Sequence, residues 1–459
     1  MVNSIFSRIS STLRLRNHDF EPDRSLRFSL YDGFFYSLMV GLGETYFGAY
    51  GVYLGANNFQ LAILASLPPF MAGISQFFTL TLLGQFKSRR KMIVFFALLQ
   101  GVMLIPAFFS FYIPSLRLEF YILFVVFYTI SGMVIGPVWN SWIGDLVPPE
   151  RRGNYFGLRN RVITIGTFLS MIFAGFWLKE LETNGHELLG FGSIFLSATL
   201  LRMFSVYYIS KKHDPVFEPM TSNLDQFIDF VKNIFSRNEG RLIVYMSLIN
   251  FAVFLSAAYC TPYLLRTLKY SYGTFVVVIS AVALAKVVSS SFWGEIVDSL
   301  GARKVFQITG LFIPLSILPW AFTGDPLLLI LSQFFSGFIW AGYELSTFTF
   351  LLDATQPTER ARVASYANIF TTSAALFGGV VGAIALTVGP VVLHEFGLIF
   401  ILSGVFRFIS YFLFMPKIQE VRIITPVKAS NVFMKATGFR PAIGFTSRLV
   451  VFRKRPPKL

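Results

Sequence analysis

The sequence predicts an all-α membrane protein that crosses a bilayer about twelve times as two similar six-helix halves. Three observations lead to this prediction: the apolar composition, the repeated apolar runs and an internal duplication. Of the 459 residues, 54% are hydrophobic, 14% are charged and 54 are Phe, more apolar surface than a soluble fold could bury. Stretches such as 92–112 and 394–416 are continuously apolar, unlike the short alternating segments of a membrane β-barrel.

Apolar runs long enough to cross a hydrocarbon core of roughly 30 Å recur along the chain. We expect membrane spans at residues 28–54, 60–84, 92–112, 119–146, 154–178, 189–210, 241–265, 272–297, 304–323, 326–354, 364–389 and 394–416. They predict one bundle over 28–210 and a second over 241–416, flanked by an arm at 1–27 and a basic tail at 417–459. The linker at 211–240 has apolar residues at helical spacing, and its helix could dock on the bundles or on lipid.

The net charge of +15 is explained by membrane topology and does not require nucleic-acid binding. Most Lys and Arg residues lie on one side of the predicted topology, in the arm, the tail, the linker and the short loops of that side. The opposite loops carry only Arg117, Lys179, Arg266 and Lys269. Because loops rich in Lys and Arg stay in the cytoplasm, we expect both termini to be cytoplasmic. We expect the protein to lie in the plasma (inner) membrane. We expect a monomer in a lipid bilayer, without a nucleic acid partner.

Three motifs recur in the same order about 205–213 residues later. The repeated pairs are 84–91 with 294–304, 145–152 with 353–362, and 202–205 with 407–410. The second pair keeps an Asp, a Pro, a Glu and two Arg, which chance explains poorly. Since six spans separate the copies, the two halves have the same orientation, related by a pseudo-twofold axis along the membrane normal.

The loop after the eighth span, Gly294 to Lys304, fits the pattern G-x-x-x-D-x-x-G-x-R-K. With this motif and the duplication, residues 28–416 resemble the major facilitator superfamily. The first-half loop keeps Gly84, Arg90 and Lys91 but is three residues shorter. The resemblance implies that spans one, four, seven and ten, helped by two, five, eight and eleven, line a central cavity.

The repeated loops also supply candidate gating residues. These are Asp145, Arg151, Gly294, Asp298, Gly301, Arg303, Lys304, Asp353 and Arg360. Asp298 and Arg303 could pair across neighbouring helix ends, and breaking such a latch would let the halves rock apart.

Three ionisable residues lie near the middle of predicted lining spans: Glu44, Lys286 and Glu344. A charge facing lipid there costs at least about 2.5–3.5 kcal/mol, so each should face a partner or a wet cavity. Lys286 could neutralise either acid or bind an anionic solute. Uncharged candidates for the same solute or proton site are Tyr343, Asn140 and Asn250.

These features predict a secondary active transporter that moves a small solute by alternating access, with two buried acids favouring proton coupling. A lipid or amphiphile carrier, an exporter, and a transporter-like sensor or assembly protein remain alternatives. The sequence has no G-x-x-x-x-G-K-[ST] loop, no H-E-x-x-H pair and a lone Cys260. We therefore expect no enzyme activity, no metal and no cofactor, and we expect an ion gradient, most simply of protons, to supply the energy.

Overall fold

The computed structural model describes residues 21–147, 152–215, 224–356 and 359–421. Within these ranges, eleven helices are long and apolar enough to cross a membrane. A further crossing at the start of the chain is divided into α2 (Glu21–Leu42), the 3-10 turn η1 (Glu44–Tyr46) and α3 (Phe47–Tyr53). The predicted all-α fold with twelve membrane crossings is therefore confirmed.

The N-terminal half contains the first six crossings. After α3 come α4 (Asn58–Ser75), η2 (Gln76–Phe78), α5 (Thr79–Phe86), α6 (Arg89–Val102), α7 (Leu104–Phe109), η3 (Ser110–Tyr112), α8 (Arg117–Leu146), α9 (Arg152–Thr183) and α10 (Glu187–Ser210). Polar caps set several of these starts: the Asn57 side chain accepts from the Gln60 amide before α4, and Ser88 accepts from Lys91 at the start of α6.

The C-terminal half repeats this arrangement after the linker helix α11 (Leu224–Lys232). Its elements are α12 (Asn238–Pro262), η5 (Tyr263–Thr267), α13 (Tyr272–Leu300), α14 (Ala302–Phe312), η6 (Ile313–Ser316), α15 (Pro319–Phe322), α16 (Pro326–Ala354), α17 (Arg360–Val388), α18 (Gly397–Phe414) and η7 (Met415–Lys417). Ser271 caps α13 and Asp325 caps α16, each by accepting from a backbone N–H of the first turn.

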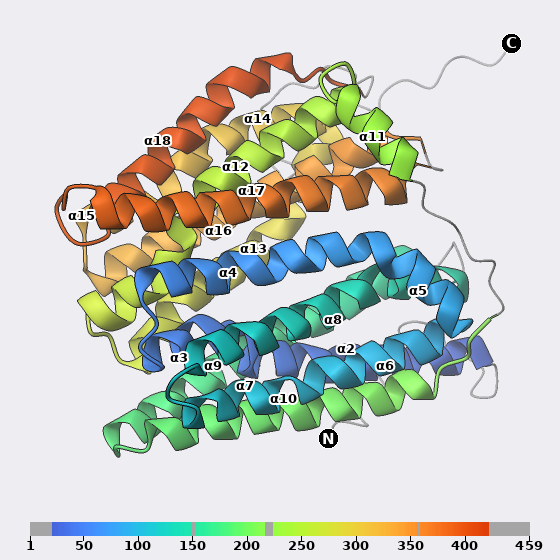
Figure 1. The fold of residues 1–459 in the computed structure, drawn as a ribbon. Helices are drawn as coiled ribbons and strands as arrows, with labels where there is room; N and C mark the ends of the chain where they lie inside the picture. Colours follow the sequence, from blue (N-terminus) through green and yellow to red (C-terminus); the bar gives the residue numbers. More distant parts are fainter. Residues whose placement is uncertain (1–20, 148–151, 216–223, 357–358, 422–459) are drawn as a thin grey trace, which may run out of the picture.

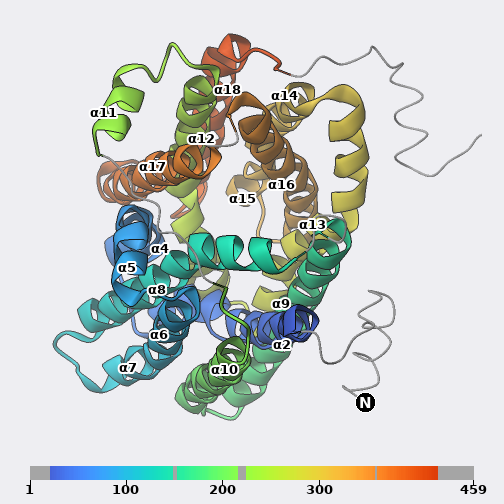
Figure 2. The ribbon, with the colours of Figure 1, turned by 90° about the vertical axis from the view of Figure 1, so that its right-hand side faces the viewer.

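The two ends of the molecule differ in charge. We call the end that carries 87–91, 211–215 and 302–304 the basic end, and the opposite end the far end; α5 and α11 mark the basic end in Figure 1. Viewed toward the basic end in Figure 2, the helices form two groups that meet where α4 lies beside α17 and α9 lies beside α13. These two helix pairs form most of the interface between the halves.

The linker helix α11 docks on the C-terminal half. Phe230 and Ile234 are buried with residues of α12 and α17, and the ring of Phe227 packs edge-on against Tyr366, 5.0 Å between centroids. Arg362 adds a 2.6 Å hydrogen bond to Gln226. Of the two placements left open by the sequence, the structure therefore shows docking on a bundle.

Candidate functional site

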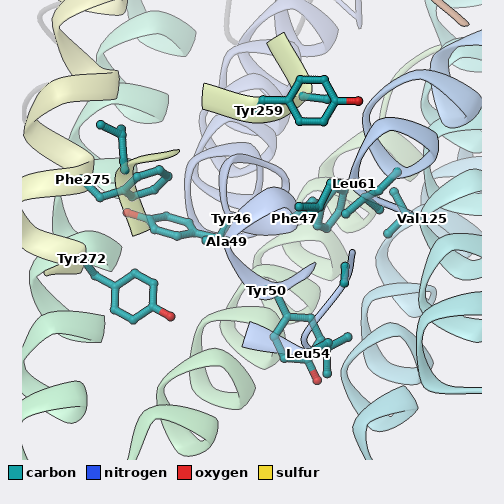
Figure 3. Packing of buried hydrophobic residues seen from close by; sticks show 14 of the residues in the cluster. Tyr46, Phe47, Ala49, Tyr50, Leu54, Leu61, Val125, Tyr259, Tyr272 and Phe275 are labelled. Atoms are coloured by element: carbon teal, nitrogen blue, oxygen red, sulfur yellow. The ribbon is translucent and has the colours of Figure 1, made fainter. Parts of the chain in front are cut away.

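An aromatic core closes the space between the halves at the far end. It combines Tyr46, Phe47, Tyr50, Leu61 and Phe191 with Tyr259, Tyr272, Phe275 and Phe396. Figure 3 shows Tyr46 of the N-terminal half reaching toward Phe275 of α13, with ring centroids 6.4 Å apart. The Tyr46 hydroxyl donates to the carbonyl of Met171 at 2.6 Å. This core, called the far-end core below, is shared by both halves.

Polar contacts reinforce the same closure. The Tyr272 hydroxyl donates to Glu187, and its backbone N–H donates to Glu182 Oε2 at 3.3 Å. Glu182 thus accepts from the first residue of α13, and Glu187 from the side chain of the same residue. Arg266 donates to the carbonyl of Ala56 across the halves. The far end is therefore held by hydrogen bonds as well as by aromatic packing.

At the basic end the halves have separate cores. One buried cluster draws its described residues from 26–209 and another from 242–418. On the α4 and α17 side, Asn368 donates to Gln76 at 3.1 Å, so that side stays joined further toward the basic end. The described halves are thus closed at the far end. Toward the basic end they are joined on the α4 and α17 side, where Phe77 also packs against Phe227 and Tyr366.

Glu44 lies at the break in the first crossing. The helix stops at Leu42, and Glu44 begins the single 3-10 turn that leads to Tyr46 and the far-end core. The Glu44 side chain is exposed, and its Oε2 accepts a 3.2 Å hydrogen bond from the buried Tyr128 hydroxyl of α8. An exposed carboxylate is not stable against hydrocarbon, so Glu44 requires a polar or aqueous environment.

Lys286 of α13 and Glu344 of α16 form an ion pair. The Lys286 Nζ lies 2.7 Å from Glu344 Oε1, and the side chains are 36% and 55% exposed. Lys286 follows Phe275 by eleven residues in α13, a rise of about 16 Å toward the basic end. Glu44, two residues before Tyr46, lies much nearer the far-end core. Lys286 therefore neutralises Glu344, and Glu44 has a different environment.

The uncharged candidates fall in three environments. Asn140 is exposed on α8, whereas Asn250 is half-buried and donates to the Met246 carbonyl of its own helix at 2.9 Å. Tyr343 is buried against Tyr245 and Trp340, and its hydroxyl has no hydrogen-bond partner among the described residues. In this conformation Asn140 is accessible, and Tyr343 belongs to the core of the C-terminal half.

The first-half gating candidate Asp145 ends α8 next to the start of α6. Its Oδ2 lies 2.7 Å from Nη1 of Arg89, a buried arginine that also donates to Ser141 at 3.0 Å. Arg151 lies outside the described residues. In the second half, Arg360 donates to the Leu352 carbonyl, one residue before Asp353, at 3.2 Å.

The second-half loop motif has a geometric basis. Gly301 joins α13 to α14 at φ +85°, a conformation that favours glycine. In the first half Lys87 takes a left-handed conformation, φ 51°, at the end of α5. Gly294 and Asp298 occupy the last turns of α13, and Lys304 is exposed on α14.

Arg303 binds the segment after α18. Its Nε donates to the Ile418 carbonyl at 2.6 Å, and its backbone N–H donates to Glu420 Oε2 at 3.1 Å. The predicted pairing of Arg303 with Asp298 stays a prediction. The contacts to 418–420 instead identify a link between α14 and the end of the twelfth crossing.

The family model of the Major Facilitator Superfamily matches residues 31–285 and 241–457. The protein belongs to this superfamily. The resemblance seen in the loop motif and the duplication is therefore confirmed, and the chain is a multi-pass integral membrane protein.

Two curated relatives of this superfamily member match about half of the chain. The multi-drug resistance efflux pump PmrA homolog of Lactococcus lactis subsp. lactis (strain IL1403) is 23% identical over 55% of this chain and 62% of its own length. The putative proline/betaine transporter of Staphylococcus haemolyticus (strain JCSC1435) is 25% identical over 52% of each. The match thus spans less than two thirds of either relative.

Solved structures share the superfamily fold over most of the chain. A bacterial homologue of the iron transporter ferroportin, in an inward-facing state, is similar with a TM-score of 0.68 and 14% identity. The similarity covers 86% of this chain and 99% of that one. At this identity the likeness shows the fold alone.

Sequence reasoning on this superfamily member predicted ion pairs for Asp32 and Arg159 near the cytoplasmic ends but missed Lys212, which completes a buried charge cluster at the basic end. Lys212, just after α10, is fully buried and pairs with Asp32 of α2, and Arg159 Nη2 of α9 lies 3.6 Å from the same carboxylate. Burial lowers the pKa of the Lys212 ammonium to about 8, although Asp32 acts in the opposite direction. The hydropathy pattern gave no signal, because Lys212 lies outside the apolar run.

Sequence reasoning also missed the first-half partner of the Arg303 contacts. Arg90 Nη1 donates to the Lys212 carbonyl at 3.2 Å, and the Arg90 backbone N–H donates to Asp214 Oδ2 at 3.4 Å. The sequence did contain a signal for this contact. Asp214 and Glu420 follow the sixth and twelfth spans, and their separation in sequence is close to that between Arg90 and Arg303.

Proposed function

We propose that this protein is a proton-coupled secondary transporter that carries a small polar solute between its two halves by alternating access. Membership of the superfamily and the two relatives, whose names denote an efflux pump and a putative proline/betaine transporter, support transport over catalysis or sensing. The observation that carries proton coupling is the position of Glu44.

Glu44 has the surroundings expected of a proton carrier. Its carboxylate is exposed, and its hydrogen-bond donor is the neutral Tyr128 hydroxyl, which does not compete with a proton as a cation would. It also lies where the first crossing is interrupted, and half-helix ends near the bilayer midplane recur at ion and substrate sites of transporters. Movement at this break would change the access of the carboxylate to water.

Glu344 is the less suitable of the two predicted acids for the proton. Its carboxylate is already paired with the Lys286 ammonium at 2.7 Å. We therefore assign the proton to Glu44 and the solute to the neighbourhood of Lys286 and Glu344.

The closed far end fits one state of an alternating-access cycle. The positive-inside rule makes the basic end cytoplasmic, so the far-end core would separate the solute from the outside. On this reading the structure corresponds to a state facing the cytoplasm, in the plasma membrane. The direction of net transport then follows from the gradients of proton and solute.

Proteoliposomes that enclose a pH-sensitive dye test this proposal. Pools of amino acids, sugars, nucleosides and quaternary amines are added outside, and both dye signal and solute uptake are recorded. With the wild-type chain, one pool should move protons together with solute. With Glu44→Gln, solute should equilibrate without a proton signal, whereas Glu180→Gln, an exposed acid of α9, should behave as wild type.

Two results would contradict the proposal. An unchanged proton signal in Glu44→Gln would exclude Glu44 as the coupling group. No solute movement by correctly folded protein, for any pool, would favour the sensor or assembly alternative, and movement of labelled lipid would favour the amphiphile carrier.

A further inference from the structure

We infer that the Lys286–Glu344 pair recognises a small zwitterionic solute whose cation and carboxylate are only a few bonds apart. This inference rests on the proposed transport function, because it names the class of solute that the site takes.

Both side chains of the pair are partly exposed within the membrane-spanning region. Lys286 and Glu344 are 36% and 55% exposed, although both lie near the middle of their spans. A charged pair does not stand exposed to hydrocarbon, so the exposed part faces water between the halves. The buried cluster of Lys212 and Asp32 differs, since its ammonium is fully enclosed.

The pair has binding capacity left over. Within the described part of the chain, the single hydrogen bond of each side chain is the one from Lys286 Nζ to Glu344 Oε1. An ammonium has three N–H donors and a carboxylate has two oxygens with several acceptor positions. At least two donors and the second carboxylate oxygen therefore remain for a solute.

Charge balance selects the class of solute. A simple anion would bind Lys286 but would approach Glu344, and a simple cation would meet the opposite problem. A solute with a single charge loses part of its hydration when it enters the site, and the site offers it no net opposite charge to compensate that cost. A zwitterion places its carboxylate on Lys286 and its cation on Glu344, so that the four charges alternate in sign and the complex stays neutral.

The spacing suits a compact zwitterion. Nζ and Oε1 are 2.7 Å apart, so the two binding positions are adjacent and a solute must present its charges side by side. An α-amino acid or a trimethylated amino acid has this arrangement. Trp340 lies one helical turn before Glu344 on the same side of α16 and is half-buried, so its ring can cover the cation.

Matched pools of probes test the inference on the purified full-length chain. The first contains trimethylglycine and the free amino acids with uncharged side chains, the second the corresponding amides, which are cations only, and the third the N-acetyl derivatives of the same amino acids, which are anions only. Binding is followed by thermal shift and by Trp fluorescence. The first pool should bind at least tenfold more tightly than the other two, because each of these lacks one of the two opposite charges and leaves Lys286 or Glu344 without its ionic contact to the solute.

Variants separate recognition from folding. Lys286→Met and Glu344→Gln should each weaken binding of the first pool at least tenfold. The double exchange Lys286→Glu with Glu344→Lys keeps both charges and should recover most of the binding. Exchange of Arg237 and Asp229, a pair of similar exposure on the linker side at 3.5 Å, should leave binding unchanged.

Equal binding of the amide or acetylated pool would overturn the inference, as would no binding of the first pool or normal binding by both single variants. These results are distinguishable from failure of the proposed function. Proton-coupled movement of a neutral solute would refute the zwitterion inference and leave the proposed transport function standing. Zwitterion binding with a proton signal unaffected by Glu44→Gln would refute proton coupling through Glu44 and leave the zwitterion inference standing.

Discussion

Arg90 and Arg303 make matching contacts in the two halves of the molecule. Arg90 begins the third crossing and binds 212–214, just after the sixth; Arg303 begins the ninth and binds 418–420, just after the twelfth. In each half the guanidinium donates to a carbonyl and the backbone N–H donates to a carboxylate two residues further on. The repeat therefore preserves a contact that ties the start of the third crossing of each half to the end of its sixth.

Arg303→Ala should lower the free energy of unfolding by about 1–3 kcal/mol, because a charge-assisted hydrogen bond is lost at a half-buried site. Lys304→Ala, the exposed neighbour, should change it by less than about 0.5 kcal/mol. Unfolding in SDS, followed by circular dichroism, measures both. Equal effects of the two variants would show that the contact contributes nothing specific.

The Lys286–Glu344 pair should show coupling in stability. Lys286→Met or Glu344→Gln alone leaves one unpaired charge within the membrane, whereas the double variant leaves none. Because both ends are partly exposed, we expect a coupling energy at the low end of the usual range, about 0.5–1 kcal/mol. A double-mutant cycle of SDS unfolding gives this value, and additive single effects would contradict it.

Gly175 should control closure of the far end. A Cβ atom added there would overlap Val276 of the opposite half, whereas one added at Gly157 of the same helix meets open space. Gly175→Val should therefore weaken far-end closure and increase the population with the basic end closed. Spin labels at residues 85 and 304, in a Cys260→Ser background, should report shorter distances by pulsed electron paramagnetic resonance. Gly157→Val serves as the control, and identical distance distributions for the two variants would reject this role.

Lys212 should make stability rise with pH in the alkaline range. Its pKa is about 8 in the folded protein against 10.5 for the free side chain. Between these values the unfolded chain binds more protons than the folded one, so the free energy of unfolding increases with pH, by an amount on the order of 1–3 kcal/mol.

Lys212→Arg is the matched variant, because a guanidinium stays charged throughout this range. The difference in melting temperature between wild type and Lys212→Arg, measured from about pH 8 to about pH 10, should grow in favour of the wild type. A constant difference would show that Lys212 keeps its proton in the folded protein.

The sequence by itself determined the all-α membrane fold, the spans and the duplication. These follow from local hydropathy and repeated motifs, because the bilayer requires about 20 apolar residues per crossing wherever the helix packs. It also placed Glu44, Lys286 and Glu344 within predicted spans and so made them site candidates, since a charge within an apolar run is visible without any knowledge of contacts.

Only the tertiary structure decided the partners. Lys286 pairs with Glu344, 58 residues away, and Glu44 accepts from Tyr128, 84 residues away, because helix packing places those side chains together. Packing likewise buries Tyr343 in the C-terminal core and joins Lys212 to Asp32. Hydropathy records how apolar a segment is, but the rotation and neighbours of each helix depend on side-chain fit across both halves.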